Sequence, residues 1–136
     1  MRVFSSLILV LLSHFLFSQD SSYVEINGNE VLLYSHNAKF PGEEKAFYEY
    51  LKKEIRYPRK AWINNIEGKV ITEFIVEIDG TLSSIRVLQG LGYGCDKEAI
   101  RLMKKSPEWT PSLMSRDKFD WIAIRQKMQI AIAFKK

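Results

Sequence analysis

The dipeptide Asp79-Gly80 stands between two runs of alternating apolar residues and limits what the chain can fold into. The apolar side of the first run consists of Val70, Thr72, Phe74, Val76 and Ile78. Asp-Gly between such runs is the strongest short-range signal for a hairpin. The pattern therefore predicts an antiparallel hairpin with strands over residues 68–78 and 81–89.

Other elements surround this hairpin. Apolar residues at helical spacing predict an amphipathic helix over residues 42–55, which Tyr57-Pro58 ends and which a short helix from Pro58 follows. A further helix is expected over residues 96–105, before Pro107. Residues 112–117 read as a polar loop, and the alternating residues 124–134 form the clearest strand. The order is helix, hairpin, helix, strand.

The last strand can pair with either hairpin strand. Pairing with residues 68–78 makes every neighbour antiparallel and leaves the last strand at the edge of the sheet. An edge presents unpaired backbone donors and acceptors that other chains can join, unless charge protects it. Lys127 and Lys135 supply that protection, or simply form the solvent-facing side of the strand.

The N-terminal residues read as a targeting segment. Residues 1–18 combine one positive charge, an apolar run and a small residue, Ser18, which predicts a signal peptide cleaved after Ser18. The alternative is an inner-membrane anchor at residues 3–18, although this run is shorter than the roughly 20 residues that span a bilayer. Residues 19–41 are expected to form an N-terminal arm, either a short hairpin or irregular, before a domain over residues 42–136.

Three glycines in the segment QGLGYGC, residues 89–95, raise the possibility of a phosphate-binding loop. A dinucleotide fingerprint needs glycine where Cys95 stands and a parallel strand-helix-strand unit, so we interpret the loop as a turn into the next helix. Asp96, or Cys95 with Glu98, is expected to cap that helix, with an anion at the helix end as the alternative. A lone cysteine forms no internal disulfide, and burial of Cys95 is favoured over an exposed thiol.

Composition argues against several function classes. The net charge is +4, but 20 basic residues are scattered among 16 acidic ones, which does not favour nucleic acid. His36 and Cys95 are far apart in the sequence, so we predict no metal site. We also predict no cofactor, no small-molecule substrate and no enzymatic activity; a hydrolase built on Cys95 is the remaining enzymatic alternative. We expect Trp62, Trp109 and Trp121 to anchor the core rather than to stack on sugars or bases.

Several landmarks together resemble the C-terminal domain of TonB over about residues 57–136. In order they are Tyr57-Pro58-x-x-Ala61, Ile66-Glu67-Gly68-x-Val70, Asp79-Gly80-x-Leu82, Asp96-x-x-Ala99-Ile100, Trp109-x-Pro111 and the terminal alternating strand. The resemblance implies an α+β fold, a two-layer sandwich of two helices packed on a three-stranded antiparallel sheet. It also implies a periplasmic location in a Gram-negative bacterium.

The resemblance further implies a binding role. Proteins of this family pair their last strand with the TonB-box peptide of outer-membrane receptors, in energy-coupled transmembrane transport. The expected partner-binding residues are Ile124, Gln126, Lys127, Met128, Gln129, Ile130, Ala131, Ile132 and Phe134. Another envelope protein is the alternative partner, and a homodimerising or structural envelope domain without energy coupling is the alternative role. The chain lacks a Pro-rich spacer, having four prolines and none in a run, so it is not expected to transduce energy alone.

Overall fold

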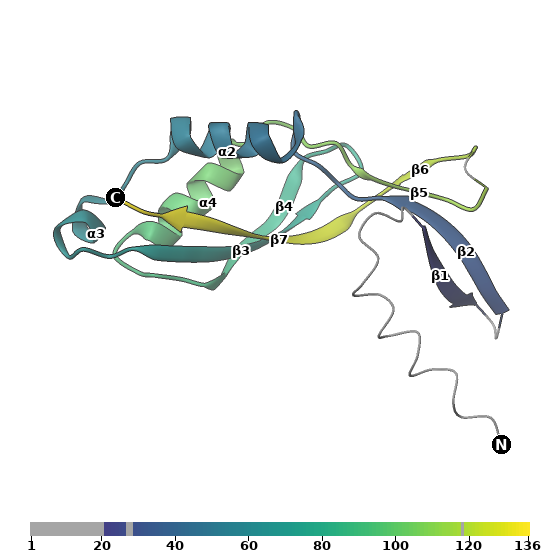
Figure 1. The fold of residues 1–136 in the computed structure, drawn as a ribbon, viewed down its shortest axis with the longest axis horizontal. Helices are drawn as coiled ribbons and strands as arrows, with labels where there is room; N and C mark the ends of the chain where they lie inside the picture. Colours follow the sequence, from purple (N-terminus) through teal and green to yellow (C-terminus); the bar gives the residue numbers. More distant parts are fainter. Residues whose placement is uncertain (1–20, 27–28, 118) are drawn as a thin grey trace, which may run out of the picture.

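The computed structural model describes residues 21–26, 29–117 and 119–136, shown as a ribbon in Figure 1. These residues form three helices and seven strands. In chain order they are β1 (Ser21–Ile26), β2 (Asn29–His36), α2 (Glu43–Glu54), α3 (Arg59–Ile63), β3 (Gly68–Val76), β4 (Leu82–Gln89), α4 (Cys95–Lys105), β5 (Ser112–Ser115), β6 (Ile122–Ile124) and β7 (Gln126–Phe134).

The central sheet has the order β4-β3-β7, and both neighbours of β3 are antiparallel to it. The predicted hairpin is confirmed: Glu77 donates its amide to the carbonyl of Thr81, and the amide of Thr81 bonds the Asp79 carboxylate at 3.0 Å. The last strand pairs with the first hairpin strand, as expected. It therefore occupies an edge of this sheet.

One face of β3 is completely buried. Val70, Thr72, Phe74 and Val76 each have 0% exposure, which confirms the alternation seen in the sequence. Ile78 was predicted to be the fifth residue of this buried face, and that prediction is wrong. Ile78 is 62% exposed, because the strand ends at Val76 and the chain turns away. The buried face packs on Phe134 and Ile132 from β7 and on α4.

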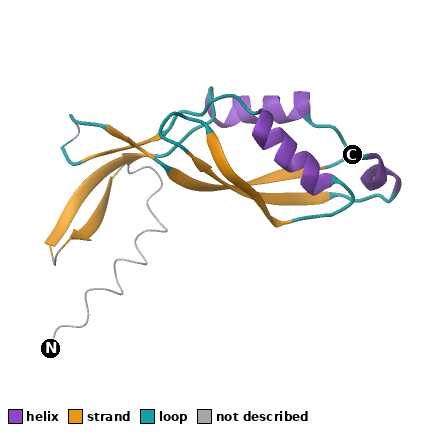
Figure 2. Ribbon diagram, turned by 180° about the vertical axis from the view of Figure 1, so that it is seen from behind, coloured by secondary structure: helices purple, strands orange, loops and turns teal. Residues whose placement is uncertain are grey.

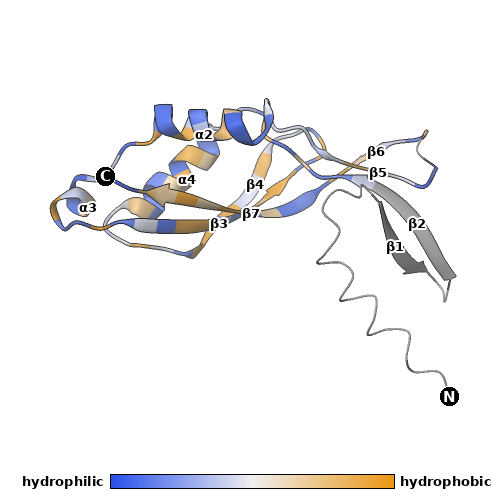
Figure 3. Cartoon of the chain, viewed as in Figure 1, coloured by the Kyte–Doolittle hydropathy of each residue, from blue (hydrophilic) through white to orange (hydrophobic). Residues whose placement is uncertain are grey.

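The helices α2 and α4 lie together on one side of this sheet, and α3 lies near the chain's C-terminal end (Figures 1 and 2). Hydropathy follows this arrangement, since the outer side of α2 is mostly hydrophilic in Figure 3. Both long helices begin after a glycine in the left-handed region, Gly42 at φ 80° and Gly94 at φ 92°. Compared with the predicted bounds, α2 is one residue shorter at each end, and α4 begins one residue earlier.

A second sheet was not predicted. Its strand order is β1-β2-β5-β6. The central strands β2 and β5 pair His36 with Leu113, and β5 pairs Ser112 with Ile124 of the edge strand β6. The arm of residues 19–41 thus contains a hairpin, which was one of the two expectations. The polar loop expected at residues 112–117 is wrong, because Ser112–Ser115 forms β5 between two neighbours.

These findings confirm the α+β class. The expected sandwich of two helices on three strands describes only part of the chain, because α3 and the second sheet add to it. The sequence patterns behind it are local, whereas β2 meets β5 across more than seventy residues of chain.

The predicted signal peptide, residues 1–18, lies outside the described residues. The structure therefore tests neither cleavage after Ser18 nor the alternative of an anchor at residues 3–18. Among the helices of the described ranges, none is long and apolar enough to cross a membrane.

Candidate functional site: a free strand edge beside a groove

The strand β7 has one paired edge. Nine consecutive residues, Gln126 to Phe134, pair with β3 without any shift in register. Within the part of the chain that the structure describes, no other strand pairs with β7. Its second edge is therefore open and regular.

A side-chain bond shows which backbone groups face this open edge. The hydroxyl of Thr72 donates to the carbonyl oxygen of Ile130 at 3.1 Å, and these two residues lie opposite each other in the β3–β7 pair. The carbonyl of Ile130 therefore faces β3. The backbone N–H and C=O groups of successive residues point to alternate edges of an antiparallel strand, so those of the residues next to Ile130 point to the open edge. The residues whose backbone groups face the open edge are Lys127, Gln129, Ala131 and Ala133.

The other edge of the central sheet, on β4, is irregular. Its register against β3 shifts between Ile71 and Thr72 and again between Glu73 and Ile75. Ser84 in the middle of β4 has φ 49°, in the left-handed region. Such bulges bend a strand and disrupt the ladder that an added chain would need. Of the two edges, only β7 presents a straight template.

A cavity of about 540 Å³ lies along the open edge of β7. Four consecutive residues, Met128 to Ala131, line it, and these point to both faces of the strand. No residue of β3 lines it. The cavity therefore follows the unpaired edge as a groove instead of lying above or below the sheet.

The opposite wall of the groove comes from the start of α2 and the segment before it. Its buried floor is aromatic: the ring of Phe40 lies 5.2 Å from that of Phe47 and 5.6 Å from that of Trp109. Its rim is exposed and carries Tyr48 and the carboxylates of Glu43 and Glu44. The groove thus has an apolar base and an acidic border.

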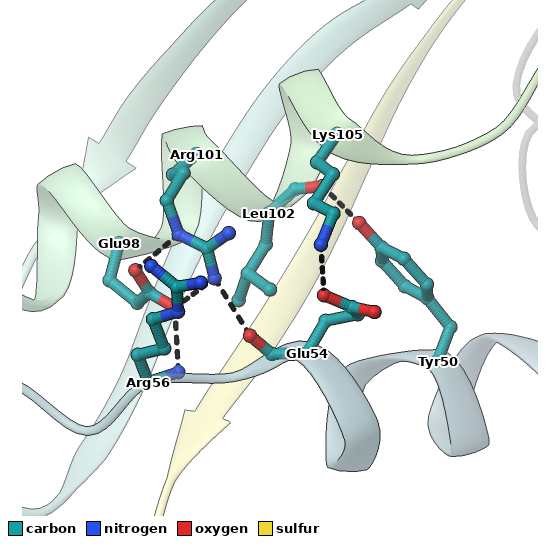
Figure 4. A network of polar contacts seen from close by, with 7 residues as sticks. All are labelled: Tyr50, Glu54, Arg56, Glu98, Arg101, Leu102 and Lys105. Atoms are coloured by element: carbon teal, nitrogen blue, oxygen red, sulfur yellow. Dashed lines mark hydrogen bonds and ion pairs between the residues drawn. The ribbon is translucent and has the colours of Figure 1, made fainter.

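The helix α4 fixes the position of α2 (Figure 4). The hydroxyl of Tyr50 donates to the carbonyl of Leu102 at 2.7 Å, and Arg101 donates to the carbonyl of Glu54 at 2.7 Å. Lys105 forms an ion pair with the carboxylate of Glu54. Because Arg101 satisfies a carbonyl in the last turn of α2, the end of that helix is tied to α4.

Glu98 is the most buried acid of this network. Its burial alone would raise its pKa, but bonds from the guanidinium of Arg101 and from the backbone amide of Arg56 outweigh burial, so the pKa of Glu98 lies below its ordinary value. Glu98 therefore remains ionised and joins α4 to the segment that follows α2.

The structure divides the predicted binding residues into two groups. Ile124 belongs to β6, where it pairs with Ser112, so it does not continue β7. The side chain of Gln126 bonds the amide of Ala38 at 2.8 Å and the side chain of Asn37 at 2.9 Å, so the chain itself covers this end of the strand. The remaining predicted residues lie on β7 as Lys127, Met128, Gln129, Ile130, Ala131, Ile132 and Phe134.

The groove wall could not be predicted from the sequence. The helical pattern predicted a buried face containing Phe47, but nothing in it placed Tyr48 or Phe40 beside a strand some eighty residues later. Trp109 is a core anchor as predicted, at 4% exposure. Trp62 is not, since it is 53% exposed and stacks edge-on against Tyr57.

The backbone amides of the glycine loop, residues 89–95, already bind a carboxylate of the same chain. The carboxylate of Asp96 accepts hydrogen bonds from the backbone amides of Leu91 at 2.9 Å and Gly92 at 3.3 Å, so it holds the loop. The prediction that Asp96 caps the helix is therefore wrong. The residue at the N-cap of α4 is Gly94, without a side-chain bond. With a carboxylate already on these amides, an anion at this place would meet like charge.

Cys95 is completely buried, as favoured from the sequence, and burial together with the charge of Asp96 raises the pKa of its thiol. His36 stacks on Trp121, with ring centroids 4.5 Å apart. Among the residues that the structure describes, no three side chains of His, Cys, Asp or Glu gather in a way that could hold a metal ion.

The fold and the open edge define a small α+β domain with an exposed strand available for pairing. The family model described as "Gram-negative bacterial TonB protein C-terminal" matches residues 53–135, and the chain belongs to this family. The match agrees with the resemblance found over about residues 57–136. Comparison with curated proteins and with solved structures finds no match.

Proposed function

We propose that this protein is a periplasmic binding module that captures an extended segment of another envelope protein by adding it as a strand to β7. The partner to which the family points is an outer-membrane TonB-dependent transporter, in energy-coupled transport. The observation that carries the proposal is the straight, unpaired edge of β7 beside a groove. In this mode of recognition the backbone bonds supply affinity and the side-chain pockets supply specificity.

The charges on β7 do not cover its edge. The ammonium group of Lys127 lies 3.9 Å from the carboxylate of Glu73 on the neighbouring strand. The same carboxylate accepts the guanidinium of Arg86 at 2.6 Å and the amide of Gln129 at 3.1 Å, and these bonds hold its pKa below the ordinary value. Lys127 is therefore drawn over the sheet face toward β3, which leaves the backbone of β7 accessible.

A proline on the open edge tests this proposal. Ala131→Pro removes an outward-facing amide while leaving the bonds to β3 in place, a substitution that edge strands tolerate. Ala131→Val is the matched control, because it keeps the amide and adds a β-branched side chain at an exposed position. A photoreactive residue in place of Lys127 would report contacts in the native envelope.

We expect the crosslinker to recover an outer-membrane transporter with Ala131→Val and to lose at least about tenfold of that product with Ala131→Pro, since several aligned backbone bonds form together. Both variants should unfold at similar urea concentrations. Equal recovery of the transporter with Ala131→Pro and with Ala131→Val would show that the edge is not used. Recovery of no transporter from the control would refute the transport partner.

A further inference from the structure

Most of the groove wall lies outside the part of the chain that matches the family. Seven of the twelve lining residues precede residue 53, and the edge itself lies within the match. These seven are Ala38, Lys39, Phe40, Glu43, Glu44, Phe47 and Tyr48. The chain thus adds its own surface beside the edge that it shares with the family.

We propose that this wall selects the captured segment: one bulky aliphatic or aromatic side chain enters the groove, and a basic side chain two residues along the segment meets the acidic rim. The proposal rests on the proposed function, because it requires a strand paired with β7. It commits to an extended peptide with this alternation as the occupant of the groove.

The apolar preference follows from strand geometry. Side chains of an added strand that lie opposite Met128 and Ile130 point to the same face as those two residues, toward α2. There they meet Tyr48 on the wall above the buried rings of Phe40 and Phe47. A cavity of about 540 Å³ accommodates a large side chain, and a small polar one would leave this apolar surface in water.

The basic preference follows from the charges of the rim. Glu43 and Glu44 are exposed at the groove, and the one lysine of this wall, Lys39, lies 3.5 Å from Glu43. Two carboxylates against one ammonium leave the wall with net negative charge. Residues on one face of a strand recur every second position, so the neighbour of the inserted side chain on that face is two residues away. A carboxylate there would be repelled and an ammonium or guanidinium attracted.

Four synthetic peptides test the preference. Each has nine residues, threonine and serine except at two variable positions: the centre is Phe or Ser, and the residue two positions later is Lys or Glu. Fluorescence anisotropy with the full chain measures their affinities. Tyr48→Ala removes the exposed aromatic ring of the wall. Tyr93→Ala is its control, because Tyr93 is similarly exposed, at 49% against 54% for Tyr48, but does not line the groove.

The expected result is a Phe,Lys peptide that binds about tenfold more tightly than the Ser,Lys peptide. Tyr48→Ala should reduce this ratio to about threefold or less, and Tyr93→Ala should leave it unchanged. The preference for Lys over Glu should be about threefold and should invert in Glu44→Lys. Glu49→Lys makes the same charge change on α2 away from the groove and should preserve it.

The two proposals fail differently. If all four peptides bind equally and Ala131→Pro abolishes their binding, the wall does not select but the edge does capture a strand. If the Phe preference is present and Ala131→Pro has no effect, the groove binds apolar side chains without strand pairing, and both proposals are wrong. If no peptide binds at millimolar concentration, selection by the wall is refuted.

Discussion

At the scale of single residues, Gly80 connects the hairpin to the groove. It is buried, its φ is 85°, and a Cβ atom there would lie 2.1 Å from the carbonyl oxygen of Trp109. The amide of Trp109 in turn donates to the carbonyl of Gly80 at 2.8 Å. Because Trp109 forms the floor of the groove, the turn that the sequence signals most strongly also supports the candidate site.

Gly80→Ala should destabilise the protein by about 3 kcal/mol or more, because the left-handed backbone and the clash with Trp109 act together. Gly92→Ala is the matched control: its φ is 69°, but no atom lies within 4 Å of the added Cβ, so only the backbone cost of about 1–2 kcal/mol applies. Urea unfolding of both variants gives the comparison. Equal losses would show that the approach to Trp109 costs nothing.

At the scale of secondary-structure elements, the position of α2 depends on its bonds to α4. Glu98 is 8% exposed and accepts bonds from Arg101 and from the amide of Arg56. Arg101 also satisfies the carbonyl of Glu54, so one charge pair holds both the end of α2 and the segment after it. The wall of the groove is thus held from the far end of its helix.

Glu98→Gln should lower the free energy of unfolding at pH 7 by about 1–3 kcal/mol, because it weakens charge-assisted bonds at a buried position. The folded-state pKa of Glu98 lies below its ordinary value of 4.5, so its contribution is complete above about pH 4.5 and is lost as the pH falls through the folded-state value. The difference between wild type and variant should therefore shrink at pH 3.

The exposed pair of Glu49 and Lys52, 3.5 Å apart on the same helix, provides the control for this experiment. Glu49→Gln should change the stability by less than about 1 kcal/mol, since solvent screens such pairs. Urea titrations at pH 7 and pH 3 measure both variants. A gap between wild type and Glu98→Gln that stays constant between these pH values would contradict the role assigned to Glu98.

At the scale of the whole molecule, the sequence predicted the elements whose signals are local. Asp79-Gly80 and the alternation of β3 predicted the hairpin, and antiparallel pairing placed β7 beside β3. The sheet containing β5 escaped prediction because Ser112–Ser115 is short and half polar, and only its neighbours β2 and β6 make it a strand.

Only the part of the candidate site with a local sequence signal could be predicted. The edge strand followed from topology and from the family resemblance, because its alternation is visible in the sequence. The wall did not, because Phe40 and Tyr48 reach β7 only through the packing of α2 on α4 and Trp109. The loss of Ile124 from the strand follows from the break at Arg125, where pairing passes from β5 to β3.

An open edge also permits two copies of the chain to pair, which is the alternative role for this domain. The groove wall argues against such pairing. A single added strand needs only about 5 Å beside β7. A second copy would bring a whole sheet and its own residues 38–48 against the wall that already flanks Met128 to Ala131. We expect light scattering to give the mass of one chain across a hundredfold dilution. The opposite outcome is a dimer that persists at the lowest concentration, is absent in Ala131→Pro and is not dissociated by the Phe,Lys peptide. This outcome would assign the edge to self-association.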